Sequence, residues 1–177
     1  MPSGKTHDAI TFVLTVPAFA AAYLTTHSIA AAATVSGAFV FGGLMFGPDL
    51  DTVSRQYSRW LFLRFLWYPY RSFFKHRSRF SHGLIFGALL RVIYFMGVST
   101  MSLFLAALVW SSVSGSKPPV LGDLTQIWQR IGEFVRTNFG ENFLLFTFLG
   151  LWFGAASHTF TDMAGSFLKT GRVAKFL

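Results

Sequence analysis

Two long apolar runs joined by a short polar turn open the chain: "AITFVLTVPAFAAAYLTTHSIAAAATVSGAFVFGGLMFG", residues 9–47. A helix needs roughly 20 residues to cross a bilayer, and the runs 9–26 and 28–47 are close to that length. Because only "TTHS" separates them, we expect a tight helical hairpin, with Pro48 ending the second helix. Pro17 is compatible with a membrane helix, and the Ala- and Gly-rich second run allows close helix packing.

Two further apolar runs, 84–112 and 143–163, are also long enough to cross a bilayer. The first of these is over-long and contains Arg91, so we expect its start to lie in the membrane interface or within the protein. The sequence therefore predicts an all-α polytopic membrane protein. We expect a four-helix transmembrane bundle with interfacial amphipathic helices, folded as a single membrane-embedded domain over residues 1–177.

The composition supports a membrane protein. Of 177 residues, 53% are hydrophobic and 12% are charged, and the mean hydropathy of +0.49 lies outside the range of ordinary soluble domains. The chain has no cysteine, which excludes disulfides, thiolate zinc sites and cysteine nucleophiles. Any bound metal must therefore use nitrogen and oxygen ligands. On so apolar a chain, the net charge of +8 indicates basic residues that lie against anionic lipid headgroups.

The N-terminal run has a second interpretation, as a secretory signal peptide. Lys5, the apolar run and "AFA" at 18–20 imitate a leader with its cleavage site. We prefer a membrane helix, because the apolar character continues beyond that point. His7 and Asp8 also stand where a basic leader would not place an acid.

Two polar segments connect the apolar runs. The first, residues 47–82, mixes basic and aromatic residues, as expected of a segment at headgroup depth. The second, residues 114–142, predicts an amphipathic helix on the opposite surface. Its apolar residues recur at helical spacing: Leu121, Leu124, Ile127, Trp128, Ile131, Phe134 and Val135.

The distribution of cations predicts the orientation in the membrane. Four crossings place the two termini and the 47–82 segment on one side, with twelve of the fifteen Lys and Arg residues when Arg91, near the edge of that side, is included. The other side holds Lys117, Arg130 and Arg136. By the positive-inside rule the basic side faces the cytoplasm. We therefore expect a multi-pass protein of the bacterial cytoplasmic membrane, or of an internal membrane such as the thylakoid.

Histidines and acids are scarce, and most of them fall at the cytoplasmic ends of the four expected helices. These are His7, Asp8, Asp49, Asp51, His76, His82, His158 and Asp162. His158 and Asp162 are separated by four residues, so they share a helix face and can hold one metal ion. Asp49 and Asp51 could bridge two ions, and His76 and His82 could close the site from the loop before the third crossing.

Each of these motifs is weak alone, because single His or Asp residues at helix ends are usually solvated caps. His158 and Asp162 carry more weight because they lie within an expected membrane segment, where ionisable groups are costly unless paired, bound or functional. His27, in the hairpin on the opposite surface, reads as a turn residue. The remaining acids, Asp123, Glu133 and Glu141, read as surface charges on the amphipathic helix.

Four stretches together resemble a known bacterial family: "MPSGKTHD", "GPDLD", "HRSRFSHG" and "SHTFTD". They look like the membrane-bound metal-dependent hydrolases, including the LexA-regulated inner-membrane hydrolases. The closest likeness is to a related metal-binding membrane protein family of unknown function, which shares "MPSGKTHD", the "PDLD" turn and "YPYR…HRS…SHG". The resemblance spans most of the chain.

The resemblance implies a multi-helix membrane protein with a His/Asp metal centre, distantly similar to zinc phospholipase C and single-strand nucleases. It also implies a ligand set, to which Asp8 is an additional candidate. The residues at the motif positions are His7, Asp49, Asp51, His76, His82, His158 and Asp162. The family's substrates are not implied by the resemblance.

The leading functional hypothesis is metal-assisted hydrolysis of a phosphoester at the cytoplasmic membrane face. One or two divalent ions would be bound, with zinc favoured over manganese or iron, and a pair of ions would acidify water and clamp a phosphoryl group. Asp51 or Asp8 could act as general base. Arg77 and Arg79 could hold the substrate phosphate, although contact with lipid headgroups explains them equally well.

Three other functions fit parts of the sequence. A structural metal in a membrane scaffold or assembly factor would leave the basic, aromatic loop free to dock a protein partner, and its coordination sphere would be closed. Metal transport fits less well, because the candidate ligands gather at one face. Nucleic-acid binding by residues 55–79 is suggested by alternating aromatics and cations, but membrane lipid is the simpler partner. For the hydrolase hypothesis, the expected substrate is a phosphorylated small molecule or lipid.

Overall fold

Helices make up every regular element of the computed structural model, which describes residues 3–74, 78–84 and 86–171. The all-α prediction is confirmed, and four helices are long and apolar enough to cross a membrane. The chain forms two compact units, Met1–Val92 with Leu145–Leu177, and Ile93–Leu144. The first unit holds the candidate site.

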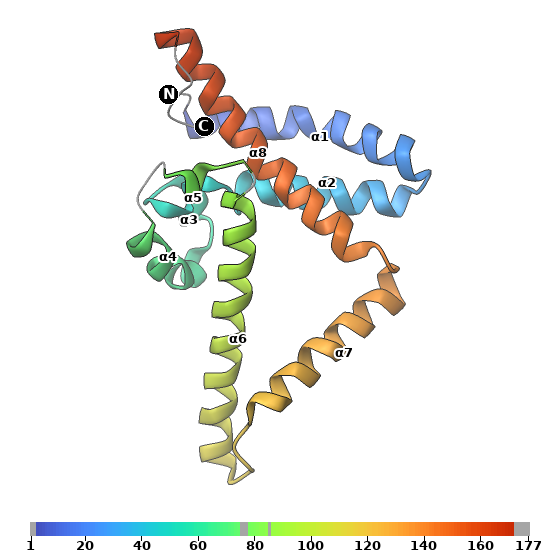
Figure 1. The fold of residues 1–177 in the computed structure, drawn as a ribbon, viewed down its shortest axis with the longest axis vertical. Coiled ribbons are helices and arrows are strands. Elements are labelled where there is room, and N and C mark those ends of the chain that lie inside the picture. The colour runs from blue at the N-terminus through green and yellow to red at the C-terminus, as the bar shows by residue number, and fades with distance from the viewer. Residues whose placement is uncertain (1–2, 75–77, 85, 172–177) are drawn as a thin grey trace. The chain divides into compact units, whose positions relative to one another are not determined.

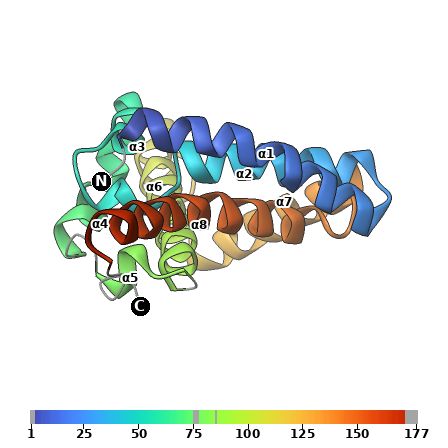
Figure 2. The ribbon, with the colours of Figure 1, turned by 90° about the horizontal axis from the view of Figure 1, so that it is seen from above.

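The predicted hairpin is formed by α1 (Gly4–Thr26) and α2 (Ile29–Leu44), which lie side by side (Figures 1 and 2). α1 begins five residues earlier than predicted because the Ser3 hydroxyl caps it, accepting a hydrogen bond from the backbone N–H of Thr6 at 3.3 Å. His7 therefore lies in the helix, one turn from its start. At the far end His27 is the C-cap, with a left-handed φ of 51°, and is a turn residue as predicted.

α8 (Phe143–Thr170) packs directly on α2 through glycines. A Cβ atom on Gly150 or Gly154 would collide with backbone carbonyl oxygens of α2, and one on Gly42 would lie 2.5 Å from the carbonyl oxygen of Leu151. The two backbones are therefore nearly in contact, as in membrane helix pairs that carry small residues four positions apart. α8 extends seven residues beyond the predicted end at 163, so His158 and Asp162 lie well inside it.

In the described part of the connection between α2 and α6, five short helices gather at the end of the hairpin where α1 begins (Figures 1 and 2). They are η1 (Pro48–Asp51), α3 (Arg55–Ser58), η2 (Leu61–Trp67), α4 (Tyr68–Phe73) and α5 (Arg79–His82). Pro48 opens η1 at a first-turn position that needs no backbone N–H.

Buried aromatic rings hold this connection against the end of α2. Trp67 is fully buried, and its ring centroid lies 5.2 Å from that of Trp60 and 5.4 Å from that of Phe46. The Trp60 indole also donates a hydrogen bond to the carbonyl of Met45 at 2.8 Å. Aromatic pairs at these separations add to the stabilisation from burial itself.

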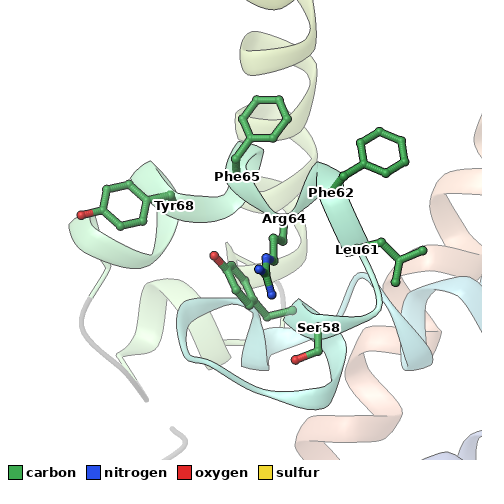
Figure 3. A pocket seen from close by; sticks show the side chains of 7 residues that line it. Ser58, Leu61, Phe62, Arg64, Phe65 and Tyr68 are labelled. Carbon is green, nitrogen blue, oxygen red and sulfur yellow. The ribbon is translucent and has the colours of Figure 1, made fainter.

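The outer face of the same connection is apolar and exposed. Phe62 and Phe65 project outward from η2, while Arg64 points into a hollow of about 570 Å³ beside Ser58 (Figure 3). Phe62 is 79% exposed and Phe65 is 61% exposed. An exposed aromatic surface with an interleaved cation fits the predicted position at headgroup depth.

α6 (Phe86–Ser114) crosses from the first unit into the second. Arg91, in its first turns, is only 2% exposed, whereas Phe86 is 63% exposed, so one face of the start of this helix packs against protein, which is one of the two predicted positions. In the second unit α7 (Leu121–Phe139) is the predicted amphipathic helix, and none of its residues is buried. The Trp128 indole donates a hydrogen bond to the Thr100 hydroxyl of α6 at 3.0 Å.

Candidate metal centre

Six of the predicted metal ligands lie together at the end of the hairpin where α1 begins. They are His7 on α1, Asp49 and Asp51 on η1, His82 on α5, and His158 and Asp162 on α8. All of these side chains are buried except that of Asp49, which is 29% exposed. The fold thus gathers groups from four separated parts of the chain into one site.

The first group of donor atoms comes from His7, His158 and Asp162. One Asp162 oxygen lies 3.2 Å from His7 Nε2, and the other lies 3.7 Å from His158 Nε2. The two imidazole rings stack with their centroids 3.8 Å apart. Ligands bound to one zinc ion at about 2.0–2.2 Å lie roughly 3.5 Å from one another, so this group is close to the required spacing.

The second group comes from Asp49, His82 and Asp162. Asp49 reaches both groups, because its Oδ1 lies 3.5 Å from His82 Nε2 and its Oδ2 lies 3.3 Å from His158 Nε2. Asp162 belongs to both groups as well. Asp49 and Asp162 therefore each lie close to members of both groups.

Asp51 contacts the Nδ1 side of the His82 ring, whereas Asp49 lies at Nε2. Its Oδ2 lies 3.5 Å from His82 Nδ1, and the Ser81 hydroxyl lies 3.1 Å from the same nitrogen. A ligating histidine commonly pairs its second nitrogen with a carboxylate, which fixes the ring orientation and tautomer. The geometry of Asp51 fits this orienting role.

The donor set fits a divalent metal ion. Three acids and three histidines meet where water is largely excluded, and buried ionisable groups are costly unless they are paired or coordinate metal. Among the described residues, His7 Nδ1 has no hydrogen-bond partner, and His158 Nε2 faces the carboxylates of Asp49 and Asp162. Imidazole nitrogen and carboxylate oxygen are ligands that zinc, iron and manganese accept.

Gln56, which is 4% exposed, supports the centre from behind. Its Nε2 lies 3.2 Å from His158 Nδ1 and donates to the carbonyl of Gly43 at 2.8 Å, and its Oε1 accepts from the backbone N–H of Asp49 at 3.1 Å. One amide thus links α2, η1 and α8 at the site. The contact of Gln56 with Nδ1 orients the His158 ring so that its Nε2 faces Asp49 and Asp162.

We predict that Gln56→Leu, which keeps the bulk and removes the amide, lowers metal affinity about 10–100-fold, as is typical when an outer partner of a ligating histidine is lost. The unsatisfied carbonyl and N–H should also cost about 1–3 kcal/mol each in stability. Competition with a chelator of known affinity measures the first effect. Gln126→Leu, on exposed α7, is the control, and equal affinities in the two variants would remove Gln56 from the site.

Arg91 fixes the position of α5. Its Nη1 donates to the carbonyl of Ser81 at 2.6 Å, immediately before His82. The start of α6 passes so close that a Cβ atom on Gly87 would lie 2.7 Å from the same carbonyl oxygen. A buried cation beside buried acids also offsets part of their charge.

A pocket of about 210 Å³ reaches the metal-ligand cluster. Three of the candidate ligands line it, namely His7, Asp49 and His158. The rest of the lining is Gly4, Asp8, Gly43, Ser54, Arg55, Gln56 and Arg59. The centre is therefore not enclosed by protein on every side.

Asp8 lies on the wall of this pocket and is paired with two arginines. Its Oδ2 lies 2.6 Å from Arg59 Nη2 and 3.1 Å from Arg55 Nη1. Among the described residues, neither donor group of the metal cluster includes Asp8. The structure thus separates Asp8 from its neighbour His7, which points into the cluster.

Three predicted site residues lie outside what the structure describes: His76, Arg77 and the side chain of Arg79. Sequence reasoning in turn missed Gln56, and it treated Arg55 and Arg59 only as interfacial cations. The available signal was slight. Gln56 is one of three glutamines in the chain and lies between Arg55 and Arg59 in the sequence. The short helices of this segment show no hydrophobic periodicity from which they could be predicted.

Comparison with known proteins is consistent with this centre. A stretch of 57 residues is 37% identical to an uncharacterized protein of Aquifex aeolicus (strain VF5), and it covers 32% of this chain and 40% of that relative. The match thus spans less than half of the relative's length. No solved structure matches the chain. Residues 2–172 match the family described as uncharacterized metal-binding protein (DUF2227), and the chain therefore belongs to that family.

Proposed function

We propose that the protein is a membrane-embedded, metal-dependent hydrolase that cleaves a phosphoester at the membrane surface. The pocket beside His7, Asp49 and His158 carries this proposal. Structural metal sites are closed by protein ligands, whereas catalytic sites keep a position open to water or substrate. A pocket lined by three candidate ligands therefore supports a catalytic site.

The proposed ligands are His7, Asp49, His82, His158 and Asp162, with zinc as the first metal to test and manganese or iron as alternatives. The sharing of Asp162 between the two donor groups, together with the reach of Asp49 to His82 and His158, supports a centre for two ions. A bound divalent ion would supply positive charge that polarises a phosphoryl group and acidifies water.

The acids would divide the remaining work. Asp49 is the acid of the cluster that lines the pocket, so it is placed to bind metal where water or substrate could enter. Asp51 contacts His82 Nδ1 and would orient that ring. Asp8 is held by two arginines, which favours a role in positioning those arginines over that of a general base.

A non-enzymatic scaffold with a structural metal is the second candidate. The exposed aromatic face of η2 and the hollow that contains Arg64 favour it (Figure 3), because such a surface could dock a protein partner. The same face is equally suited to the membrane interface. The accessible pocket at the metal cluster is what favours the enzyme.

We also propose that both termini and the metal centre face the cytoplasm, since twelve of fifteen cations lie on their side of the expected topology. Reporter fusions at either terminus test this. A reporter that functions only in the cytoplasm should be active at both ends. Activity of a periplasm-only reporter at either end would reverse the topology.

The enzymatic proposal is tested by turnover of soluble and lipid phosphoesters by the purified protein in detergent, loaded in turn with zinc, manganese and iron. Release of phosphate or alcohol should require metal and should be lost in Asp49→Asn. His27→Ala, whose side chain lies at the opposite end of α1, should turn over like the wild type. A fully metal-loaded protein that cleaves none of these esters would favour the scaffold.

A further inference from the structure

Two arginines line the pocket above the metal-ligand cluster. Arg55 begins α3, and Arg59 follows its last residue. Because they are four residues apart on one helical turn, they lie on the same side of it. Asp8, on α1, is paired with both of them. The two cations and one anion leave a net positive charge on this wall.

Arg59 is occupied by structural contacts. One terminal nitrogen donates to the carbonyl of Leu44 at 2.8 Å, and the other donates to Asp8 at 2.6 Å. These bonds connect the end of α2, the start of α1 and the connecting segment. Arg59 is therefore an anchor for Asp8.

Arg55 has a different environment. Its side chain is 52% exposed, and one terminal nitrogen lies 3.1 Å from Asp8 Oδ2. Its aliphatic stem crosses the first turn of α1 so closely that a Cβ atom on Gly4 would lie 2.6 Å from Arg55 Cδ. A guanidinium carries five N–H donors in a fixed fork, so one contact with Asp8 leaves donors for an anion.

We propose that Arg55 binds the phosphate of the substrate, and that Asp8 is the positioning residue that holds its guanidinium over the pocket. The inference rests on the proposed function and names the substrate class at that site: an anionic phosphate group, from a soluble ester or from a lipid headgroup. Arginine binds phosphate through two parallel hydrogen bonds. His7 and His158 line the same pocket, so a phosphate bound there would lie near the metal ligands.

The volume of the pocket supports this substrate class. About 210 Å³ is less than the 300–1,000 Å³ typical of sites that enclose a whole drug-sized ligand. A phosphate with its nearest substituents is the part that would enter. The remainder of an ester would lie outside, in water or in the membrane interface.

The test measures binding of inorganic phosphate to zinc-loaded, detergent-purified protein by calorimetry. Arg55→Gln should weaken binding about tenfold or more, the loss expected for a hydrogen-bonded charged partner. Metal content and the thermal midpoint should be unchanged. Arg64→Gln is the matched control, because it removes one positive charge from the same connection at an exposed position outside the pocket. Arg55→Lys, which keeps the charge and loses the fork, should bind with intermediate affinity.

Two membrane probes identify the source of the phosphate: nanodiscs of phosphatidylcholine alone, and nanodiscs that also contain phosphatidic acid. Preferential binding to phosphatidic acid that Arg55→Gln abolishes supports the pocket with a lipid headgroup in it. Loss of inorganic phosphate binding without such a preference supports the pocket with a soluble ester.

Equal phosphate affinity in the wild type and Arg55→Gln would overturn the inference, as would equal losses in Arg55→Gln and Arg64→Gln. The hydrolase proposal fails separately. Binding through Arg55 without cleavage of any ester would leave the anion pocket standing and refute the enzyme. If Arg55→Gln cleaves the ester as fast as the wild type, the enzyme stands and the binding of phosphate by Arg55 is refuted.

Discussion

Replacing Asp162 by Asn is expected to remove most of the bound metal and to lower the thermal stability of the protein. Asp162 is the one residue shared by both donor groups, and its carboxylate is 4% exposed. Loss of its charge would remove the carboxylate that lies 3.2 Å from His7 Nε2 and one of the two that face His158. Breaking a buried charge pair of this kind costs about 3–5 kcal/mol, and metal binding to a folded site adds to folding stability. Elemental analysis and thermal unfolding in detergent measure the two effects.

Two further variants sharpen this result. Asp162→Glu keeps the charge but moves it by one methylene, so it should retain part of the metal and lose hydrolytic activity. Glu133→Gln removes an acid from exposed α7 and should change neither metal content nor stability. Unaltered metal content in Asp162→Asn would mean that the cluster is an ion-pair network that holds no metal.

Gly42→Ala should produce the second large effect, because it separates α2 from α8. The added Cβ would lie 2.5 Å from the carbonyl oxygen of Leu151, a backbone atom that cannot move aside by itself. Overpacking of this kind typically costs about 1–3 kcal/mol. α2 leads into η1, while α8 carries His158 and Asp162, so metal affinity should fall together with the midpoint of thermal unfolding.

The control for this prediction lies on the same helix. A Cβ atom on Gly37 meets nothing within 4 Å, and alanine favours helix over glycine by roughly 0.5–1 kcal/mol. Gly37→Ala should therefore leave stability unchanged or raise it slightly. If both variants unfold at the same temperature, close packing of α2 on α8 does not hold the site together.

The four long helices could be predicted because a bilayer requires each spanning segment to satisfy its own backbone hydrogen bonds, so hydropathy alone locates them. Their ends depend on finer signals. Ser3 extends α1 back to Gly4, and the polar residues after 163 do not interrupt α8, which runs to Thr170 before Gly171 adopts a φ of 65°. Capping of this kind is local, and it is easily missed beside a strong apolar run.

The clustering of the histidines and acids could also be anticipated, because ionisable residues are scarce and the topology places them at one level. The contacts that Gln56 and Asp8 make could not be predicted from the sequence. Each contacts groups brought to it by the connection between α2 and α6, whose path is set by buried rings such as Trp67. Such tertiary packing leaves no periodic trace in the sequence.

Elemental analysis of the full-length protein, purified in detergent and dialysed against metal-free buffer, tests the central claim most directly. We expect one or two divalent ions per chain in the wild type, the same content in His27→Ala, and loss of most of the metal in His158→Ala. A wild-type protein that retains no metal after loading, or equal losses in the two histidine variants, would contradict a metal centre built from this His/Asp cluster.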